Sequence, residues 1–346
     1  MSQSRIKWGI LGTSFISTTM ADAIQNAEFG ELTAIGSRSA ASAKAFAQQF
    51  AIPKFYASHQ EVLDDPEIDA IYIGLPNHLH KEWMIRCAQA GKHILCEKPL
   101  TTSLAEAQEA LAEVNVAGVF CMEALMYRCH PLIAKLSEVI KQNTIGDIKH
   151  INAVYTANIA HLANPIAGGS ILNLGCYPVS LVRLLVGLHL GNNFAEPVEM
   201  KAMGRLNSNN RDNQASVLLK FENNIMASVS TADDMEMNYQ FEIYGSKGRL
   251  RFITNPWLPT QDDNRFDVYL YDQDVSHEIS VKADKPLYTY QIDAVSQHIL
   301  SGDRQSYFIS WQDSIGNMTV LHSWLQQILL HAEQNESNTM MDKEAI

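Results

Sequence analysis

The chain has 346 residues, and its 26 Lys and Arg against 38 Asp and Glu give a net charge of −12. A chain of this length is too long for one ordinary core and fits two domains. The acidic balance argues against nucleic acid and anionic membranes as main partners, because both attract surfaces rich in Lys and Arg. We therefore expect a globular protein whose partner is a small molecule, with no nucleic-acid and no membrane partner.

The cysteines indicate the compartment. They are odd in number and show no CxxC spacing, so they predict neither a disulfide framework nor a zinc site; they are Cys87, Cys96, Cys121, Cys129 and Cys176. The amino terminus has no apolar region of the signal type, and no later run of about 18 apolar residues predicts a membrane span. Reduced thiols in a cytoplasmic protein are the expectation.

Residues 1–122 alternate short β-branched runs with helical spacing, which is typical of βαβ units. The predicted strands are 5–11, 32–36, 69–74, 92–96 and 118–122. The predicted helices between them are 14–28, 40–50, 78–90 and 103–113, with Ser39 and Ser103 as N-caps. This order predicts a dinucleotide-binding α/β domain of the Rossmann type, with a doubly wound parallel sheet.

The pattern changes from residue 123, and residues 123–334 predict a second α+β domain with a mostly antiparallel open sheet. Its predicted helices are 131–142, 170–187, 286–301 and 310–332. Its predicted strands are 148–158, 198–206, 214–221, 225–232, 239–245, 248–253 and 266–271. The polar run 207–213 is expected as a loop, and 335–346 as a flexible tail with little to bury.

The first predicted strand leads into a possible phosphate-binding turn. A dinucleotide fold needs a tight turn here, so that backbone N–H groups and the helix amino end face the pyrophosphate. Gly12 is the turn residue, but the GxGxxG fingerprint would have glycine where Ser14 and Ser17 stand. The motif is weak by itself, since Gly9 and Gly12 could also serve only the strand and the turn.

The end of the second predicted strand bears on which dinucleotide would bind. Ser37 and Arg38 stand where NAD-preferring proteins carry an acidic residue for the ribose 2′-hydroxyl. A guanidinium can pair with a 2′-phosphate and stack on adenine, so NADP(H) is favoured and NAD(H) stays possible. The alternative is that Arg38 is a solvated cation at a helix start.

Lys98 stands at the end of an apolar run, in Gly91-Lys92-His93-Ile94-Leu95-Cys96-Glu97-Lys98-Pro99. Ligands of open α/β sheets lie beyond the carboxyl ends of the strands, so a lysine there is a candidate catalytic group. The alternative is a lysine that extends from a strand end into solvent.

Several motifs together resemble the Gfo/Idh/MocA oxidoreductase family over nearly the whole chain. They are Gly9-Ile10-Leu11-Gly12-Thr13-Ser14, Leu75-Pro76-Asn77-His78-Leu79-His80, Glu97-Lys98-Pro99, Met122-Glu123-Ala124-Leu125-Met126-Tyr127-Arg128, Gly168-Gly169-Ser170-Ile171-Leu172-Asn173-Leu174-Gly175-Cys176-Tyr177 and Tyr244-Gly245-Ser246-Lys247-Gly248. Within the family, Tyr177 and the residues around 123–131 are most similar to the branch of glucose-fructose oxidoreductase, xylose dehydrogenase and dihydrodiol dehydrogenase.

The resemblance implies roles for individual residues. Lys98 and Tyr177 are implied as catalytic, beside the carbon that exchanges a hydride with nicotinamide; an ammonium near a phenol makes the phenol a better acid. Substrate or support roles are implied for Glu97, Asn173, Glu123 and Arg128. Cofactor contacts are implied for Gly9, Gly12, Thr13, Ser14, Phe15, Ile16, Ser37, Arg38, Leu75, Pro76, Asn77, His80, Glu97 and Lys98.

One residue departs from the family pattern. The family usually has an aspartate four residues before the catalytic tyrosine or histidine, whereas this chain has Asn173. An amide can hydrogen-bond a substrate hydroxyl but cannot accept a proton. A catalytically silent nucleotide-binding sensor or regulatory protein on the same fold is therefore the alternative function. His78 and His80 carry no carboxylate or thiolate at ligand spacing, so no metal is expected.

The leading expectation is an NADP(H)-dependent oxidoreductase. It would transfer a hydride to or from a hydroxyl or carbonyl carbon of a sugar, a cyclic polyol or a diol. The open face of the second-domain sheet has no predicted helix to cover it, so a homodimer or homotetramer through this face is also expected.

Overall fold

The computed structural model describes residues 4–161 and 168–344. The described chain divides into two compact units. The first comprises Met1–Ala134, Leu258–Asp263 and Lys282–Ile315, and the second comprises Lys135–Trp257, Asn264–Val281 and Gly316–Ile346. The sequence places one boundary at residue 122, whereas the chain returns twice to the first unit. Local periodicity carries no information about such returns.

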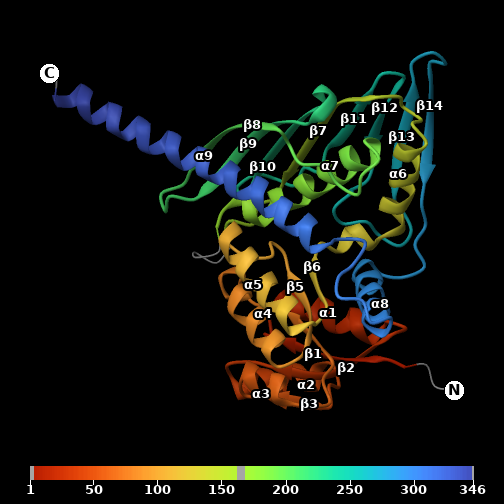
Figure 1. Ribbon diagram of the computed structural model, residues 1–346, viewed down its shortest axis with the longest axis vertical. Coiled ribbons are helices and arrows are strands. Elements are labelled where there is room, and N and C mark those ends of the chain that lie inside the picture. The colour runs from red at the N-terminus through yellow and green to blue at the C-terminus, as the bar shows by residue number, and fades with distance from the viewer. Residues whose placement is uncertain (1–3, 162–167, 345–346) are drawn as a thin grey trace. The chain divides into compact units, whose positions relative to one another are not determined.

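The first unit contains, among the described residues, a six-stranded parallel sheet with the order β3-β2-β1-β4-β5-β6 (Figure 1). Its strands are β1 (Ile6–Leu11), β2 (Gly30–Gly36), β3 (Lys54–Tyr56), β4 (Ala70–Ile73), β5 (His93–Glu97) and β6 (Cys121–Ala124). The crossover helices are α1 (Phe15–Gln25), α2 (Ala40–Gln49), α3 (His59–Asp64), α4 (His80–Gln89) and α5 (Leu104–Ala117). This arrangement confirms the predicted doubly wound sheet.

Two elements of the first unit are not predicted from the sequence. Strand β3 has three residues and α3 has six, which is too short for either to show a periodic pattern. The predicted caps are confirmed, because the Ser39 hydroxyl accepts from the Ser42 N–H and the Ser103 hydroxyl accepts from the Glu106 N–H, both at 3.3 Å.

Helix α8 (Leu287–Leu300) completes the first unit although it comes late in the sequence. Trp8 of β1 is fully buried, and its indole N–H donates to the Ser296 hydroxyl at 3.1 Å. Consecutive strand residues point to opposite faces of a sheet. The Trp8 side is therefore covered by α8, while the Gly9 side packs against α3.

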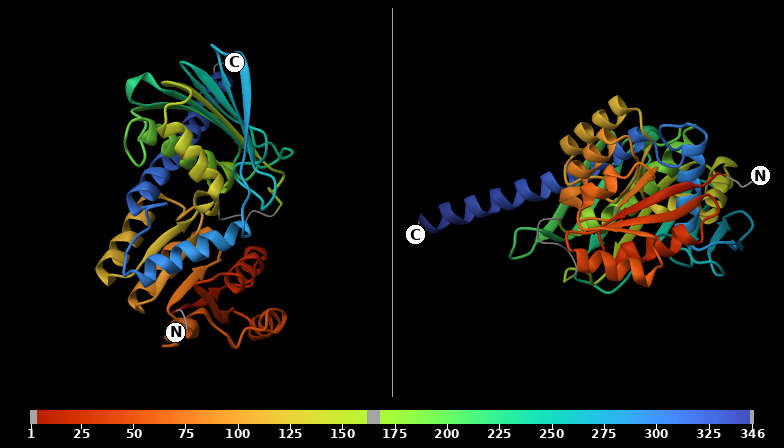
Figure 2. Two further views of the ribbon diagram at one scale, coloured as in Figure 1. Left: turned by 90° about the vertical axis from the view of Figure 1, so that its right-hand side faces the viewer. Right: turned by 90° about the horizontal axis from the view of Figure 1, so that it is seen from below.

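The second unit contains, within the described ranges, an eight-stranded sheet with the order β14-β13-β12-β11-β7-β10-β9-β8 (Figures 1 and 2). Only the β10–β7 pair is parallel among the pairs described. The strands are β7 (Ile148–Thr156), β8 (Glu199–Leu206), β9 (Asp212–Lys220), β10 (Met226–Ala232), β11 (Phe241–Gly245), β12 (Gly248–Phe252), β13 (Arg265–Leu270) and β14 (Val275–Ser280). The mostly antiparallel open sheet is confirmed.

Two strand predictions need correction. Strand β14 is missing from the prediction because its residues are almost all exposed, so no alternation marks it. Strand β9 begins at Asp212, inside the polar run that the sequence predicts as a loop. Asp212 is 1% exposed, so its polarity reflects a buried contact rather than a solvated turn.

The helices of the second unit differ from the prediction at two points. The stretch expected as one α-helix starts as a π-helical segment, η3 (Ile171–Gly175), and continues as α7 (Cys176–His189). Helix α9 (Trp311–Glu344) carries the backbone of 335–344, which the sequence predicts as a flexible tail. This stretch lacks Gly and Pro, so nothing in its sequence stops helix propagation. Helix α6 (Pro131–Lys141) lies where it is predicted.

Among the described helices, Ile171–His189 is long and apolar enough, by length and composition, to cross a membrane. Its most apolar window is 83% buried inside the structure, and α7 packs on β7 and β10. Core helices of soluble proteins pass the same test of length and composition.

Candidate functional site

The turn after β1 has the geometry that a pyrophosphate-binding loop requires. Gly12 has φ of +95°, and a Cβ there would lie 3.0 Å from Leu75 Cδ2 and 3.3 Å from the Gly74 carbonyl oxygen. A side chain is therefore excluded both by backbone conformation and by space. The turn delivers the chain to α1, whose first turn has no acidic residue, so the positive end of the helix dipole is uncompensated by charge there.

Ser14 and Ser17 replace the later glycines of the fingerprint, and the structure shows how they are accommodated. The Ser14 hydroxyl caps α1 by accepting from the Ser17 N–H, and the two hydroxyls lie 3.0 Å apart. Ser17 is fully buried, and a Cβ on Gly74 would lie 2.9 Å from its hydroxyl. The close approach of helix to strand is thus provided by Gly74 on the strand side.

Gly9 lies in the middle of β1, where a Cβ would strike Val62 Cγ1 at 2.8 Å. Its small size serves the packing of α3, and it stands three residues before the turn. The predicted contacts Thr13, Phe15 and Ile16 belong to the turn and the first helical turn, and Phe15 is 86% exposed.

Ser37 and Arg38 follow β2, the neighbour of β1. Ser37 is buried, and its backbone N–H donates to the Tyr56 carbonyl at 3.2 Å. Arg38 is exposed, and within the described part of the chain its guanidinium makes no hydrogen bond or ion pair. Burial lowers the pKa of nearby His59, and the charge of Arg38 lowers it further, so the guanidinium is the only permanent charge of this pair.

His80 ties the loop after β4 to the loop after β5. Its Nδ1 lies 3.0 Å from the Pro99 carbonyl oxygen and its Nε2 lies 2.8 Å from the Leu75 carbonyl oxygen. Burial lowers the pKa of His80, with Lys98 adding to the effect and the backbone carbonyls opposing it. At 1% exposure the ring holds the two loops together, while Pro76 is exposed at the edge and Asn77 is buried.

Lys98 directly follows β5, at the same sheet edge as the turns after β1, β2 and β4. It is half-buried, and the peptide bond to Pro99 is cis. Glu97 is buried beside it, accepting a hydrogen bond of 2.7 Å from the Tyr72 hydroxyl and one of 3.2 Å from the Lys98 N–H. Burial raises the pKa of Glu97, and the positive charge of Lys98 opposes this rise.

Glu123 and Arg128 support this edge from inside the first unit. Glu123 on β6 is 2% exposed; its carboxylate accepts from the Leu100 N–H at 3.0 Å and from the Ser314 hydroxyl at 2.8 Å. Arg128 forms a buried ion pair with Asp313 at 3.0 Å. Glu123 thereby fixes the residues that follow Lys98.

The second unit carries Asn173 in η3 and Tyr177 in the first turn of α7. The Asn173 amide donates to the Gly169 carbonyl at 2.9 Å, a bond that a carboxylate could not make. Tyr177 is 7% exposed and packs edge-on against Tyr155, with ring centroids 5.4 Å apart. π-Helical turns inside α-helices are frequent at functional sites, and this one contains Asn173 and leads into the helical turn that carries Tyr177.

The start of η3 depends on a residue that the sequence does not single out. The Asp212 carboxylate accepts from the Ser170 hydroxyl at 3.0 Å and from the Ile171 N–H at 2.6 Å. A Cβ on Gly169 would lie 1.8 Å from the Asp212 carbonyl oxygen, so Gly169 has to be glycine. Residues 162–167, directly before this loop, lie outside the described residues.

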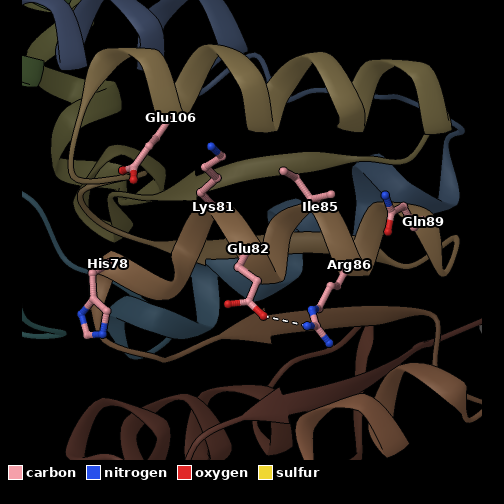
Figure 3. A pocket seen from close by; sticks show the side chains of 7 residues that line it. All are labelled: His78, Lys81, Glu82, Ile85, Arg86, Gln89 and Glu106. Atoms are coloured by element: carbon pink, nitrogen blue, oxygen red, sulfur yellow. Dashed lines mark ion pairs between the residues drawn. The ribbon is translucent and has the colours of Figure 1, made fainter.

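A separate hollow of about 410 Å³ lies along α4 and α5 in the first unit (Figure 3). Its charged side chains pair with each other or with neighbours: Arg86 with Glu82 at 2.9 Å, and Lys81 with Glu109. Glu106 accepts from the Thr102 hydroxyl at 2.6 Å. The hollow runs along paired surface helices, and we do not assign it to the site.

The family now follows from comparison with known proteins. Residues 6–125 match the family described as "Oxidoreductase family, NAD-binding Rossmann fold", and residues 133–251 match the "GFO/IDH/MocA C-terminal domain". The chain belongs to the Gfo/Idh/MocA oxidoreductase family. The resemblance inferred from the motifs is confirmed, and the chain is an NAD(P)-dependent oxidoreductase in class.

Curated relatives extend over nearly the whole chain. A trans-1,2-dihydrobenzene-1,2-diol dehydrogenase of Xenopus tropicalis is 30% identical over 333 residues, covering 93% of this chain and 98% of that protein. An uncharacterised oxidoreductase of Rhizobium meliloti is 32% identical over 329 residues, covering 92% and 95% of the two chains.

Solved structures share the fold. KijD10, a 3-ketoreductase from Actinomadura kijaniata in complex with TDP-benzene and NADP in an open conformation, superposes with a TM-score of 0.80 at 26% identity, covering 94% of this chain and 97% of that one. An aldose-aldose oxidoreductase from Caulobacter crescentus complexed with glycerol reaches a TM-score of 0.82 at 20% identity, covering 93% and 97%. The second likeness concerns the fold alone.

Proposed function

We propose that the protein is an NADP(H)-dependent oxidoreductase that transfers a hydride to or from a hydroxyl or carbonyl carbon of a diol, a sugar or a cyclic polyol. One observation carries the proposal: the half-buried Lys98, backed by buried Glu97, follows its strand at the same sheet edge as the Gly12 turn. Lysine chemistry and a dinucleotide turn at one edge fit hydride transfer coupled to a proton transfer.

The residues at this edge fit a dinucleotide. Gly12 has no side chain to keep a ligand away from its backbone, and the N-cap of α1 is the uncharged Ser14. Both features favour a pyrophosphate, because N–H groups and the helix dipole face an anion there. When bound, nicotinamide supplies or accepts the hydride at C4.

Arg38 supports NADP(H) over NAD(H). It is exposed and, among the described residues, has no carboxylate partner to compete with a 2′-phosphate. Ser37 stands beside it in place of the acidic residue that would bind a ribose 2′-hydroxyl and repel phosphate. The 3-ketoreductase of similar structure was solved with NADP.

Lys98 and Tyr177 are the groups that we propose for the proton. In the oxidative direction the substrate hydroxyl loses a proton as its carbon loses the hydride, so a group within hydrogen-bond reach must accept that proton. Tyr177 takes this role as a phenolate, which becomes the phenol when it accepts the proton, and Lys98 stabilises negative charge on oxygen. In the reductive direction the same groups return the proton.

The relatives favour a vicinal diol as substrate, because several of them are named trans-1,2-dihydrobenzene-1,2-diol dehydrogenases. The proposal is tested by stopped-flow measurement of NADP⁺ and NAD⁺ reduction with trans-1,2-dihydrobenzene-1,2-diol, D-xylose, D-glucose and myo-inositol. We expect NADPH formation with at least one of them, and faster reduction of NADP⁺ than of NAD⁺.

Tight binding of NADPH without hydride exchange for any compound in either direction would instead support the silent sensor. That alternative draws on Asn173, which accepts no proton and already uses its amide for the Gly169 carbonyl.

We also propose a homodimer or homotetramer formed through the outer face of the second-unit sheet. This face carries exposed apolar side chains on β8 and β9, with Met203 78% and Leu218 49% exposed. Light scattering at micromolar concentration tests it, and a monomer there would contradict it. A cytoplasmic location is proposed because the five cysteines are odd in number, show no CxxC spacing and are all buried.

A further inference from the structure

The loop before η3 is fixed by strands that lie far away in the sequence. Asp212 on β9 is 1% exposed and places one carboxylate oxygen within 3.0 Å of the Ser170 hydroxyl and 2.6 Å of the Ile171 N–H. A carboxylate at the amino end of a helical segment accepts from N–H groups that have no partner within the helix. Asp212 is therefore the cap of the segment that carries Asn173 and Tyr177.

The same loop is held by further contacts. The Thr231 hydroxyl on β10 donates to the Ser170 carbonyl at 3.3 Å. The Asn173 amide and backbone N–H both donate to the Gly169 carbonyl, at 2.9 and 3.1 Å. Because Gly169 lies directly on the Asp212 backbone, a shift of Asp212 moves the loop with it.

Asp212 is an unusual choice for a cap because it is charged and buried beside a second acid. Asp233, the residue after β10, is 3% exposed, and its Oδ1 has no hydrogen-bond partner among the described residues. Asp234 follows it and pairs with Arg205 of β8 at 2.6 Å, so its charge is compensated. Residues 171–175 contain no titratable group, and Arg211 directly precedes Asp212, one residue before β9 begins.

We propose that Asp212 is a positioning residue of the reaction, because its carboxylate fixes the π-helical segment between Ser170 and Tyr177 and thereby sets turnover rather than cofactor affinity. The inference rests on the proposed function for its kinetic readout. It assigns no contact between Asp212 and substrate.

The electrostatics of Asp212 predict a pH dependence by which this role can be recognised. Burial raises the pKa of Asp212 to about 6, with Asp233 adding to the rise and the bonds from Ile171 and Ser170 opposing it. Protonation replaces two charge-assisted hydrogen bonds by weaker neutral ones, so the helix start loosens as pH falls through about 6. The same protonation removes a buried charge, so it stabilises the folded chain relative to the unfolded one.

As pH falls through about 6, the start of η3 therefore becomes less ordered while the free energy of unfolding of the whole chain rises. For Asp212 the folded pKa is raised above its unfolded value, so its contribution to stability is present at low pH and is lost as pH rises through about 6. A residue with a merely structural role would change activity and stability together.

The experiment compares Asp212→Asn and Asp212→Ala with Asp234→Asn, a matched control at an exposed carboxylate that pairs with Arg205 and Asn213. At pH 8 we expect kcat to fall about tenfold in Asp212→Asn and further in Asp212→Ala, with the Kd for NADPH within twofold of wild type. The wild-type kcat should fall as pH drops through about 6, and Asp212→Asn should lack this acid limb. Asp234→Asn should keep the wild-type kcat and profile.

Hydrogen exchange of peptides covering 168–180 supplies a readout that needs no turnover. Corrected for intrinsic rates, wild-type protection should decline as pH falls through about 6, and Asp212→Asn should show no such step. If no compound is turned over, the proposed function fails and exchange alone decides this inference. A kcat within twofold of wild type with an unchanged acid limb, equal loss of NADPH binding, or an exchange step retained in Asp212→Asn overturns it.

Discussion

The candidate residues fall into two halves, one in each unit, that are constructed differently. In the first unit the edge is set by backbone turns: Gly12 at φ +95°, the capped start of α1 and the end of β5. In the second unit the segment 170–177 is set by buried side chains, above all Asp212. Turns at strand ends form from residues that are close in the sequence, whereas the second half is held by residues of the distant strands β9 and β10. Perturbing the first half should therefore affect cofactor binding, and perturbing the second should affect turnover.

The largest expected effect is on Lys98, the one side chain of the first half with a chemical role. Lys98→Met keeps length and removes the ammonium, so we expect kcat to fall about 10²- to 10⁴-fold, the usual range for a proton-transfer group. The Kd for NADPH, from fluorescence titration, should change much less. Turnover retained in Lys98→Met would refute the role proposed for it.

Matched glycine variants separate the two halves directly. Gly12→Ala adds a Cβ to a left-handed residue 3.0 Å from Leu75, so we expect the Kd for NADPH to rise about tenfold or more. Gly169→Ala adds a Cβ 1.8 Å from the Asp212 oxygen and should lower kcat while leaving the Kd near wild type. Titration and steady-state rates on both variants check this. A loss of cofactor affinity in Gly169→Ala would remove the distinction.

Arg38 tests the nucleotide preference alone. Arg38→Gln removes the exposed guanidinium, and a charge-assisted bond of about 1.5–3 kcal/mol corresponds to a Kd for NADPH raised about 10- to 100-fold. Binding of NADH should be unchanged, since no 2′-phosphate is present. Isothermal titration with both nucleotides measures the difference, and a parallel loss of NADH affinity would argue for a structural role instead.

The smallest effect concerns pH and stability, where two buried aspartates should behave oppositely. Hydrogen bonds from Lys54, Glu67 and Tyr56 lower the pKa of Asp65 to about 2 although burial acts against them. Its folded pKa lies below its unfolded value, so Asp65 stabilises the fold above pH 4 and this contribution is lost as pH falls towards 2. Asp65→Asn should cost about 1.5–3 kcal/mol at pH 7, the scale of a hydrogen bond to a charged group, and nothing near pH 2.

For Asp212 the sign is reversed, so the stability difference between wild type and Asp212→Asn should shift in favour of the variant as pH rises through about 6. Urea unfolding at pH 5 and pH 8 measures both variants. If the stability difference between wild type and variant changed in the same direction with pH for Asp65 and Asp212, the opposite pKa shifts given to the two carboxyl groups would be contradicted.

The sequence predicts the first half of the site better than the second for a physical reason. Gly12, Arg38 and Lys98 all follow strands of one parallel sheet, so strand recognition alone brings them to one edge. Asp212 lies in a polar run that resembles a loop, and its partners Ser170 and Ile171 are about 40 residues away. No periodicity connects such residues.

In the fold, too, local patterns predict some features and leave others out. The alternation of strands and helices predicts both sheets, but not the π-helical turn at Ile171–Gly175, because a π turn and an α turn share one apolar pattern. The close approach of Ser17 to Gly74 is also not predictable from the sequence, because Ser17 lies on α1, Gly74 follows β4, and no local pattern connects them.

The burial of Trp8 against Ser296 joins residues 288 positions apart. Proteins made on the ribosome generally fold their amino-terminal parts first, but this first unit lacks one covering helix until almost nine-tenths of the chain has been synthesised. A fragment ending near residue 134 would expose the Trp8 face of its sheet, so an expressed nucleotide-binding half should carry residues 282–315 as well. The nascent enzyme has a long interval in which that apolar surface is available to chaperones.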